Sequence, residues 1–400
     1  MRIVSSSVRK GPSLEAQKFT IDSGGRSQNI AATFAPTEIS VVRMIDGKEE
    51  KKTIPIPAGA LVLDDPTVGL LGKGAPEPGT KIDFYVLDPM TLALVKCAAE
   101  YVGPSPFEYD SVKGIGQKIK IIDPRATSEI WLDSKGQMAF GTGPLGMTMR
   151  PITREEAVGS EGYLPEVDIA SASRVVPDKP IESPKTIKSL KLRLVGASLP
   201  RLAGDYFQTV TRNEDGSTTL TVHPPAVPSA PSSVAKVGPM QPEFLKATTN
   251  IPATADEMVA LAKQVVGNET NSFKAAQAIS NHVFKIMRPN ASIGVLRDAR
   301  EILRTKEGVC RDYATLAATL MRAAGIPTKL VTGTVYSNDG FYYHAWVESW
   351  VGDRWIAFDP TLGGGLADAT HIKFAEGHAE EAFLSFTLEG AKIEVLDIVR

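Results

Sequence analysis

The sequence GVCRDYATLAATLMRAAGIP, residues 308–327, decides the fold of the C-terminal part of the chain. Its apolar residues recur at the spacing of one helix face, and Gly325 and Pro327 are typical helix stop signals. The inward positions are Tyr313, Leu316, Ala317, Leu320, Met321 and Ala324. The predicted helix begins beside Cys310, where unpaired backbone N–H groups and the helix dipole favour the thiolate form. The same N–H groups would stabilise an oxyanion.

Three short strands are predicted after this helix. They cover residues 328–336, 341–350 and 354–358. Side chains alternate between the two faces of a strand, so His344, Trp346 and Glu348 share one face. A hairpin centred on the turn at 351–353 places residue 359 or 360 opposite His344. Asp359 is therefore expected to reach the imidazole.

Cys310, His344 and Asp359 are the residue types of a nucleophile, a general base and an orienting acid. Glu348, on the same face as His344, is the alternative orienting acid. Taken singly, each residue has a plainer interpretation: a packed thiol, a core histidine and a turn-forming acid. Their order along the chain, with the cysteine at a helix start, favours the catalytic interpretation. Asp312, in the first helical turn, is interpreted as structural.

These residues resemble the core of the transglutaminase-like superfamily. Four motifs in order carry the resemblance: GVCRDYA at 308–314, AGIP at 324–327, HAWVE at 344–348 and WIAFDPT at 355–361. The gaps of 34 residues from Cys to His and 15 from His to Asp are typical of compact microbial members. The resemblance covers about residues 250–365. It implies a papain-like core with Cys310 as nucleophile, His344 as general base and acid, and Asp359 as orienting acid.

Upstream of this core, apolar residues recur with a period of about 3.6, which predicts helices. The expected helices are residues 254–266, opened by a capping box at 254–257, 272–287 and 298–304. Before them, six prolines between Pro224 and Pro242 favour an extended linker. We therefore predict a β-rich region at 1–223 with room for two subdomains, a linker at 224–244 and a catalytic domain at 245–400.

The region 1–223 has the pattern of antiparallel strands. Short segments rich in Ile, Val, Phe and Tyr alternate with Gly, Pro, Asp and Asn, and turn sequences at 133–136 and 213–216 mark two hairpins. The fold class is thus α+β: an N-terminal antiparallel sandwich or half-barrel, followed by the papain-like α+β core. The N-terminal region resembles β-rich domains that are often attached to such cores in bacteria.

Composition and charge exclude several classes of protein. With 44 Lys and Arg against 46 Asp and Glu, the formal charge is −2, so no basic surface for nucleic acid is expected. No apolar stretch approaches the length of about 20 residues that crosses a bilayer. The first eight residues contain no apolar run of signal-peptide length. The expected location is cytoplasmic by default, or exported if a leader has been removed.

No metal or cofactor is expected. Cys310, His344 and Asp359 have suitable ligand types, but three protein ligands make this the weaker interpretation. The other histidines, His223, His282, His371 and His378, show no ligand spacing. Cys97 lies in a β-like run and is expected to be buried and inert.

The predicted activity is thiol-dependent acyl transfer on a peptide or protein substrate. A thiolate attack on an amide carbonyl would give a thioester, which water resolves in a peptidase or amidase and an amine resolves in a transamidase. Without the additional domains of animal transglutaminases, hydrolysis is favoured. One alternative is a catalytically silent scaffold that binds peptide or glycan through its β region. Another is an assembly protein with incidental thiol reactivity.

Overall fold

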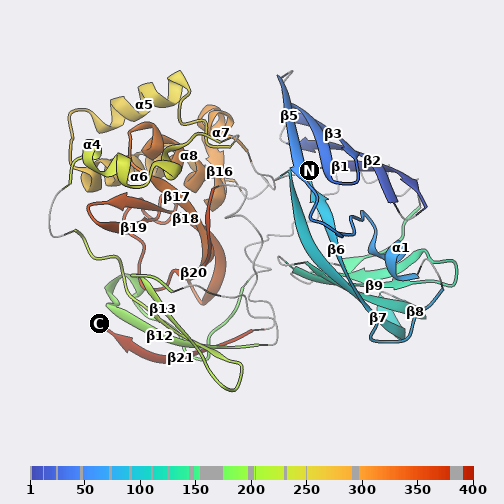
Figure 1. Cartoon of the computed structure of the whole chain (residues 1–400). Helices are drawn as coiled ribbons and strands as arrows, with labels where there is room; N and C mark the ends of the chain where they lie inside the picture. The colour runs from blue at the N-terminus through green and yellow to red at the C-terminus, as the bar shows by residue number, and fades with distance from the viewer. Residues whose placement is uncertain are drawn as a thin grey trace. The chain divides into compact units, whose positions relative to one another are not determined.

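The chain forms two compact units, Met1–Val167 and Asp168–Arg400, in a computed structural model (Figure 1). The structure describes residues 2–11, 13–23, 26–45, 48–71, 74–89, 92–109, 111–123, 126–143, 148–153, 174–196, 202, 204–228, 232–248, 250–290, 297–378 and 391–400. Among these residues, every helix is too short or too polar to cross a membrane.

The first unit contains two antiparallel sheets in which each strand pairs with the next along the chain. One sheet consists of β1 (Arg2–Lys10), β2 (Ser13–Ser23), β3 (Arg26–Phe34), β4 (Glu38–Ile45) and β5 (Lys48–Pro55). The other consists of β6 (Lys81–Asp88), β7 (Ala93–Tyr109), β8 (Val112–Asp123), β9 (Ala126–Leu132), β10 (Met138–Thr142) and β11 (Thr148–Met149). A short helix, α1 (Pro66–Leu71), packs near β6 and β7. The predicted N-terminal antiparallel region is confirmed.

Alternating burial explains why these segments are strands. In β4, Ile39 and Val41 are buried whereas Ser40 between them is exposed, as in a sheet with one face on a core. Phe84 and Ile119 are buried in the core of the second sheet. Cys97 lies in the same core, as predicted, with its thiol 3.8 Å from the Val95 carbonyl.

The second unit is built around a four-stranded sheet with the order β19-β18-β17-β20. These strands are β17 (Thr328–Ser337), β18 (Gly340–Val351), β19 (Arg354–Phe358) and β20 (Ile372–Gly377). One face packs on helices α6 (Ser272–Ile286) and α8 (Cys310–Ala323), and α8 packs in turn on α5 (Asp256–Val266) and α7 (Ala299–Thr305) (Figure 1). The other face packs on a sheet of β13 (Gln208–Arg212), β14 (Thr218–Val222), β12 (Ser189–Val195) and β21 (Lys392–Val399). Because both faces are covered, β17 is buried from Thr328 to Tyr336.

The helices follow the predicted ranges to within two residues at each end. The first, α5, begins at Asp256 with Ala255 as its N-cap, and no side chain caps it. The predicted capping box is therefore wrong, because Thr254 lies one residue before the N-cap position that a box requires. By contrast, α6 and α7 are capped by the Asn271 and Asp298 side chains.

The contact boundary between units differs from the predicted linker. It falls at Val167 and Asp168, whereas residues 224–244 lie inside the second unit. Two observations account for this. Strand β12 belongs with the C-terminal strand β21, where Leu192 pairs with Val395. In the Pro-rich stretch, α4 (Val234–Val237) buries Val237 completely.

Candidate active site

Cys310 is the first residue of α8, and the geometry of this helix start depends on Asp312. The Asp312 carboxylate accepts the Val309 N–H at 2.9 Å and the Arg297 guanidinium at 3.1 Å. Burial raises the pKa of Asp312, against the opposing charges of Arg311 and Arg297. Gly308 leaves room for the Asp312 side chain in this cap, since a Cβ at residue 308 would lie 2.5 Å from Asp312 atoms. Asp312 thus has the contacts of the structural role expected from the sequence.

His344 lies on β18 and faces both other predicted residues. Its side chain is buried, its Nε2 is 3.0 Å from Asp359 Oδ2, and the Cys310 side chain is among the neighbours that influence its pKa. Since Nε2 is used by Asp359, Nδ1 is the nitrogen left for the thiol. Burial alone would lower the pKa of His344, but the charge and hydrogen bond of Asp359, with a smaller effect of Cys310, raise it to about 10. The imidazolium form is therefore stabilised.

Asp359 directly follows β19, and its contact with His344 arises from a register different from the predicted one. Val347 pairs with Phe358 and Val351 with Arg354, which shifts the position opposite His344 by one or two residues. The shift occurs because the turn has two central residues, of which Gly352 has a φ of 76°. The ladder ends at Phe358, and the Asp359 side chain turns towards His344 from just beyond it.

The Asp359 carboxylate is fully satisfied by hydrogen bonds. Oδ1 accepts the backbone N–H groups of Thr361 at 2.8 Å and Leu362 at 3.1 Å, while Oδ2 accepts from the two histidines, His344 and His371. Burial alone would raise the pKa of Asp359, but the charged histidines and their hydrogen bonds hold it below its usual range. The group at the base of the site is therefore an oriented carboxylate.

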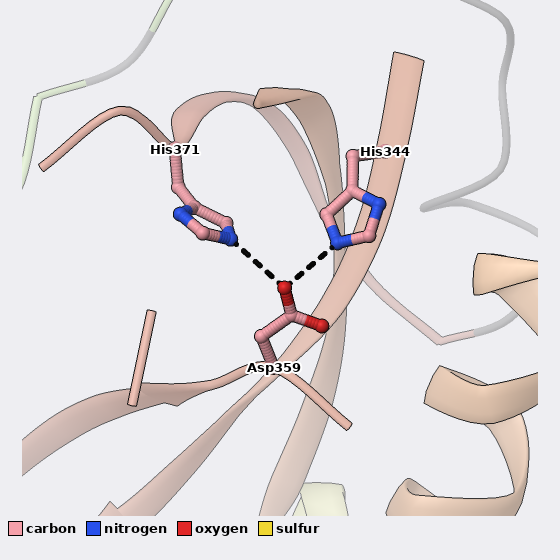
Figure 2. A group of neighbouring side chains, drawn as sticks. All are labelled: His344, Asp359 and His371. Atoms are coloured by element: carbon pink, nitrogen blue, oxygen red, sulfur yellow. Dashed lines mark hydrogen bonds and ion pairs between the residues drawn. The ribbon is translucent and has the colours of Figure 1, made fainter. Parts of the chain in front are cut away.

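The sequence gives His371 no metal-ligand spacing and no role at the site, yet the structure places it beside Asp359. Its Nε2 lies 3.1 Å from Asp359 Oδ2, the same oxygen that His344 contacts (Figure 2). It directly precedes β20, which pairs with β17 across an irregularity between Thr332 and Gly333. This pairing and the bridge of Phe358 to Leu366 bring the residue to Asp359, and neither follows from a local hydrophobic period.

Glu348, the alternative orienting acid, has lysine partners. Its carboxylate lies 3.0 Å from Lys329 Nζ and 3.1 Å from Lys373 Nζ, and Lys373 also pairs with Asp205 and Glu376. Burial would lower the pKa of Lys373, but these three acids raise it. Glu348 thus belongs to a separate buried charge cluster on the same strand as His344.

Two groups of described residues place metal-ligating atoms within 4.8 Å of one another. One is His344, Asp359 and His371, in which the contacts of 3.0 and 3.1 Å are those of hydrogen bonds. The other is Asp205, Glu348 and Glu376, whose carboxylates all lie against the Lys373 ammonium. Lys373 supplies the positive charge that a cation would supply in this second group.

A cavity of about 1360 Å³ borders the site on the side of Asp359 and His371. Ile181, Tyr336 and Leu366 form part of its wall. The Asp359 and His371 side chains nevertheless remain 2% and 3% exposed, so their mutual contact is made in a largely dry environment.

The sequence profile of the transglutaminase-like superfamily matches residues 259–360, which include the cysteine, histidine and aspartate of the site. Residues 259–360 therefore belong to this superfamily. Mouse kyphoscoliosis peptidase is 36% identical over 93 residues, which are 21% of this chain and 14% of that protein. An uncharacterised protein of Mycobacterium leprae is 26% identical over 127 residues, or 30% of this chain and 45% of that protein. The chain thus spans less than half the length of these relatives.

One solved structure, of a candidate cysteine protease from Cytophaga hutchinsonii, aligns at a TM-score of 0.36 with 20% identity. The alignment covers 54% of this chain and 85% of that one.

Proposed function

We propose that the chain is a thiol-dependent acyl-transfer enzyme in which Cys310 is the nucleophile. The observation that carries the proposal is a buried His344 whose Nε2 lies 3.0 Å from Asp359 and whose ring interacts with Cys310 at the start of α8. A thiol at a helix start, an imidazole and an orienting carboxylate form the arrangement of cysteine hydrolases. The match of residues 259–360 to the transglutaminase-like superfamily supports the same class of chemistry.

In this mechanism His344 accepts the thiol proton through Nδ1, and Asp359 stabilises the resulting imidazolium. The thiolate attacks an amide carbonyl, and the backbone N–H of Cys310 at the start of α8 donates to the oxyanion that forms. His344 then returns the proton to the leaving amine as the C–N bond breaks. A thioester on Cys310 remains.

We further propose that water resolves this thioester, so that the enzyme is a peptidase or amidase rather than a transamidase. Water would attack the thioester carbonyl and give a proton to His344. The C–S bond then breaks, His344 returns that proton to the Cys310 sulfur, and the carboxylic acid product leaves. The name of the mouse relative, a peptidase, supports this preference. The substrate is then a peptide or protein.

The first experiment is intact-mass analysis of iodoacetamide labelling across pH, on the parent protein, Cys310→Ala and His344→Ala. If Cys310 is activated by His344, a single alkylation adduct forms near pH ~6, where an ordinary thiol with a pKa of about 8.5 is protonated. The adduct is absent in Cys310→Ala and forms at least about tenfold more slowly in His344→Ala. Labelling that follows an ordinary thiol and is unaffected by His344→Ala contradicts the proposal.

A further inference from the structure

The Asp359 carboxylate is shared by two histidines, of which the proposed mechanism uses one. The His344 and His371 Nε2 atoms lie 3.0 and 3.1 Å from the same Oδ2 atom, one on each side (Figure 2). All three side chains are at most 5% exposed. A buried carboxylate that accepts two side-chain donors at one oxygen has little freedom to rotate.

We propose that His371 is a positioning residue, which holds Asp359 in the orientation and charge state that His344 requires. The inference rests on the proposed function, because it concerns how the Cys310 and His344 pair is supported. His371 acts through Asp359 and touches neither the thiol nor the reacting carbonyl in the proposed mechanism.

His371 is itself held in place on its other side. Its Nδ1 lies 3.1 Å from Asp368 Oδ1, and that oxygen also accepts the Thr370 backbone N–H at 2.8 Å and the Thr370 hydroxyl at 2.6 Å. The Trp346 ring packs edge-on against the imidazole, with centroids 5.2 Å apart. A side chain fixed at both ring nitrogens and across one face is suited to orienting a partner.

The backbone beneath His371 is placed by a close approach at Gly333. A Cβ at this position would overlap the carbonyl oxygen of Ile372, the residue next to His371, and lie 2.9 Å from the Trp346 ring. The absence of a side chain at Gly333 lets β20 approach β17 closely enough for His371 to reach Asp359.

The charges that face His371 fit the same role. Asp359 and Asp368 lie on either side of its ring, and His344 lies 5.7 Å away, centroid to centroid. Burial would lower the pKa of His371, but the hydrogen bonds and charges of the two acids raise it. A protonated His371 in turn helps to keep Asp359 ionised. Asp368, His371, Asp359, His344 and Cys310 thus form one continuous series of contacts.

The test compares His371→Leu, which removes the donor, with His371→Gln, whose amide nitrogen restores a donor near the position of Nε2. His344→Ala reports on the proposed function, and His282→Leu on helix α6 is the control for losing a histidine elsewhere. The readout is the rate of Cys310 alkylation by iodoacetamide from pH 4 to pH 10. Each variant is checked by its melting temperature, and EDTA is present throughout so that metal binding does not contribute.

We expect His371→Leu to slow alkylation at pH ~6 by about ten- to a hundredfold, the effect of losing one hydrogen bond to a charged group. The fall of the alkylation rate at low pH should also move to higher pH in this variant, because Asp359 becomes protonated more easily. We expect His371→Gln to stay within about threefold of the parent rate, and His282→Leu to match the parent.

Three outcomes would contradict this inference. In the first, His371→Leu alkylates at the parent rate, with the same fall in rate at low pH, while His344→Ala is slow. This result overturns the role of His371 and leaves the proposed function intact. In the second, His371→Gln folds but alkylates as slowly as His371→Leu, or alkylates slowly while His371→Leu does not fold. This result shows that a hydrogen-bond donor to Asp359 is not sufficient for the role. Parent-like rates in His344→Ala as well overturn the proposed function together with the inference.

Discussion

The two units achieve their strand pairing in different ways. In the first unit, both sheets pair strands that are neighbours along the chain, from β1 to β5 and from β6 to β11. In the second unit, β12 pairs with β21 about two hundred residues later, and β17 pairs with β20 across the intervening hairpin. A sheet assembled from distant segments can be covered on both faces, and such a sheet can hold buried charges such as those of His344 and Asp359. The candidate site therefore depends on the non-local pairings.

The largest expected effect comes from breaking one non-local pairing at Gly333. In Gly333→Ala the new Cβ overlaps the Ile372 carbonyl oxygen, which is backbone and cannot rotate away. We expect the free energy of unfolding of the second unit to fall by about 4 kcal/mol or more, with loss of rapid Cys310 alkylation. Chemical denaturation and iodoacetamide labelling measure the two effects.

Gly365→Ala is the matched control, because a Cβ there meets no atom within 4 Å and the residue lies in the same unit. It should change stability by less than about 0.5 kcal/mol. A Gly333→Ala protein as stable as Gly365→Ala would mean that the close approach of β20 to β17 is not required.

A core substitution in the first unit should destabilise that unit without changing the thiol chemistry. Ile39 is fully buried between β-strand neighbours, so Ile39→Ala should lower the free energy of unfolding of the first unit by about 3 kcal/mol. Cys310 alkylation under native conditions should stay at the parent rate. Ile115→Ala, at a side chain that is 77% exposed, is the control and should be nearly neutral. Slower alkylation in a folded Ile39→Ala protein would contradict this separation.

The same contrast explains what the sequence could predict. Helices α6 and α8 and strands β17 to β19 follow from periodicity and turn residues, because each is determined by local pattern. The contact between His344 and Asp359 was also predicted, although the register differed by one or two residues. His371 was missed because its position depends on the pairing of β20 with β17, which no local pattern specifies. The division into compact units at Val167 and Asp168 also depends on a non-local pairing, since β21 completes the sheet that β12 begins.

The smallest effect is a dependence of stability on pH that is confined to the second unit. All five histidines lie beyond residue 222, so the first unit has none to titrate. The ion pair with Asp359 raises the pKa of His344 from 6.5 to about 10, despite its burial.

A raised folded-state pKa contributes stability that is full below pH 6.5 and is lost as the pH rises towards 10. Between pH ~7 and ~9 the second unit should therefore lose on the order of 1–2 kcal/mol relative to His344→Gln, while the first unit shows no such difference. Denaturation of both proteins at each pH, followed separately for each unit, measures this, and equal pH slopes for parent and His344→Gln would argue against a charged His344.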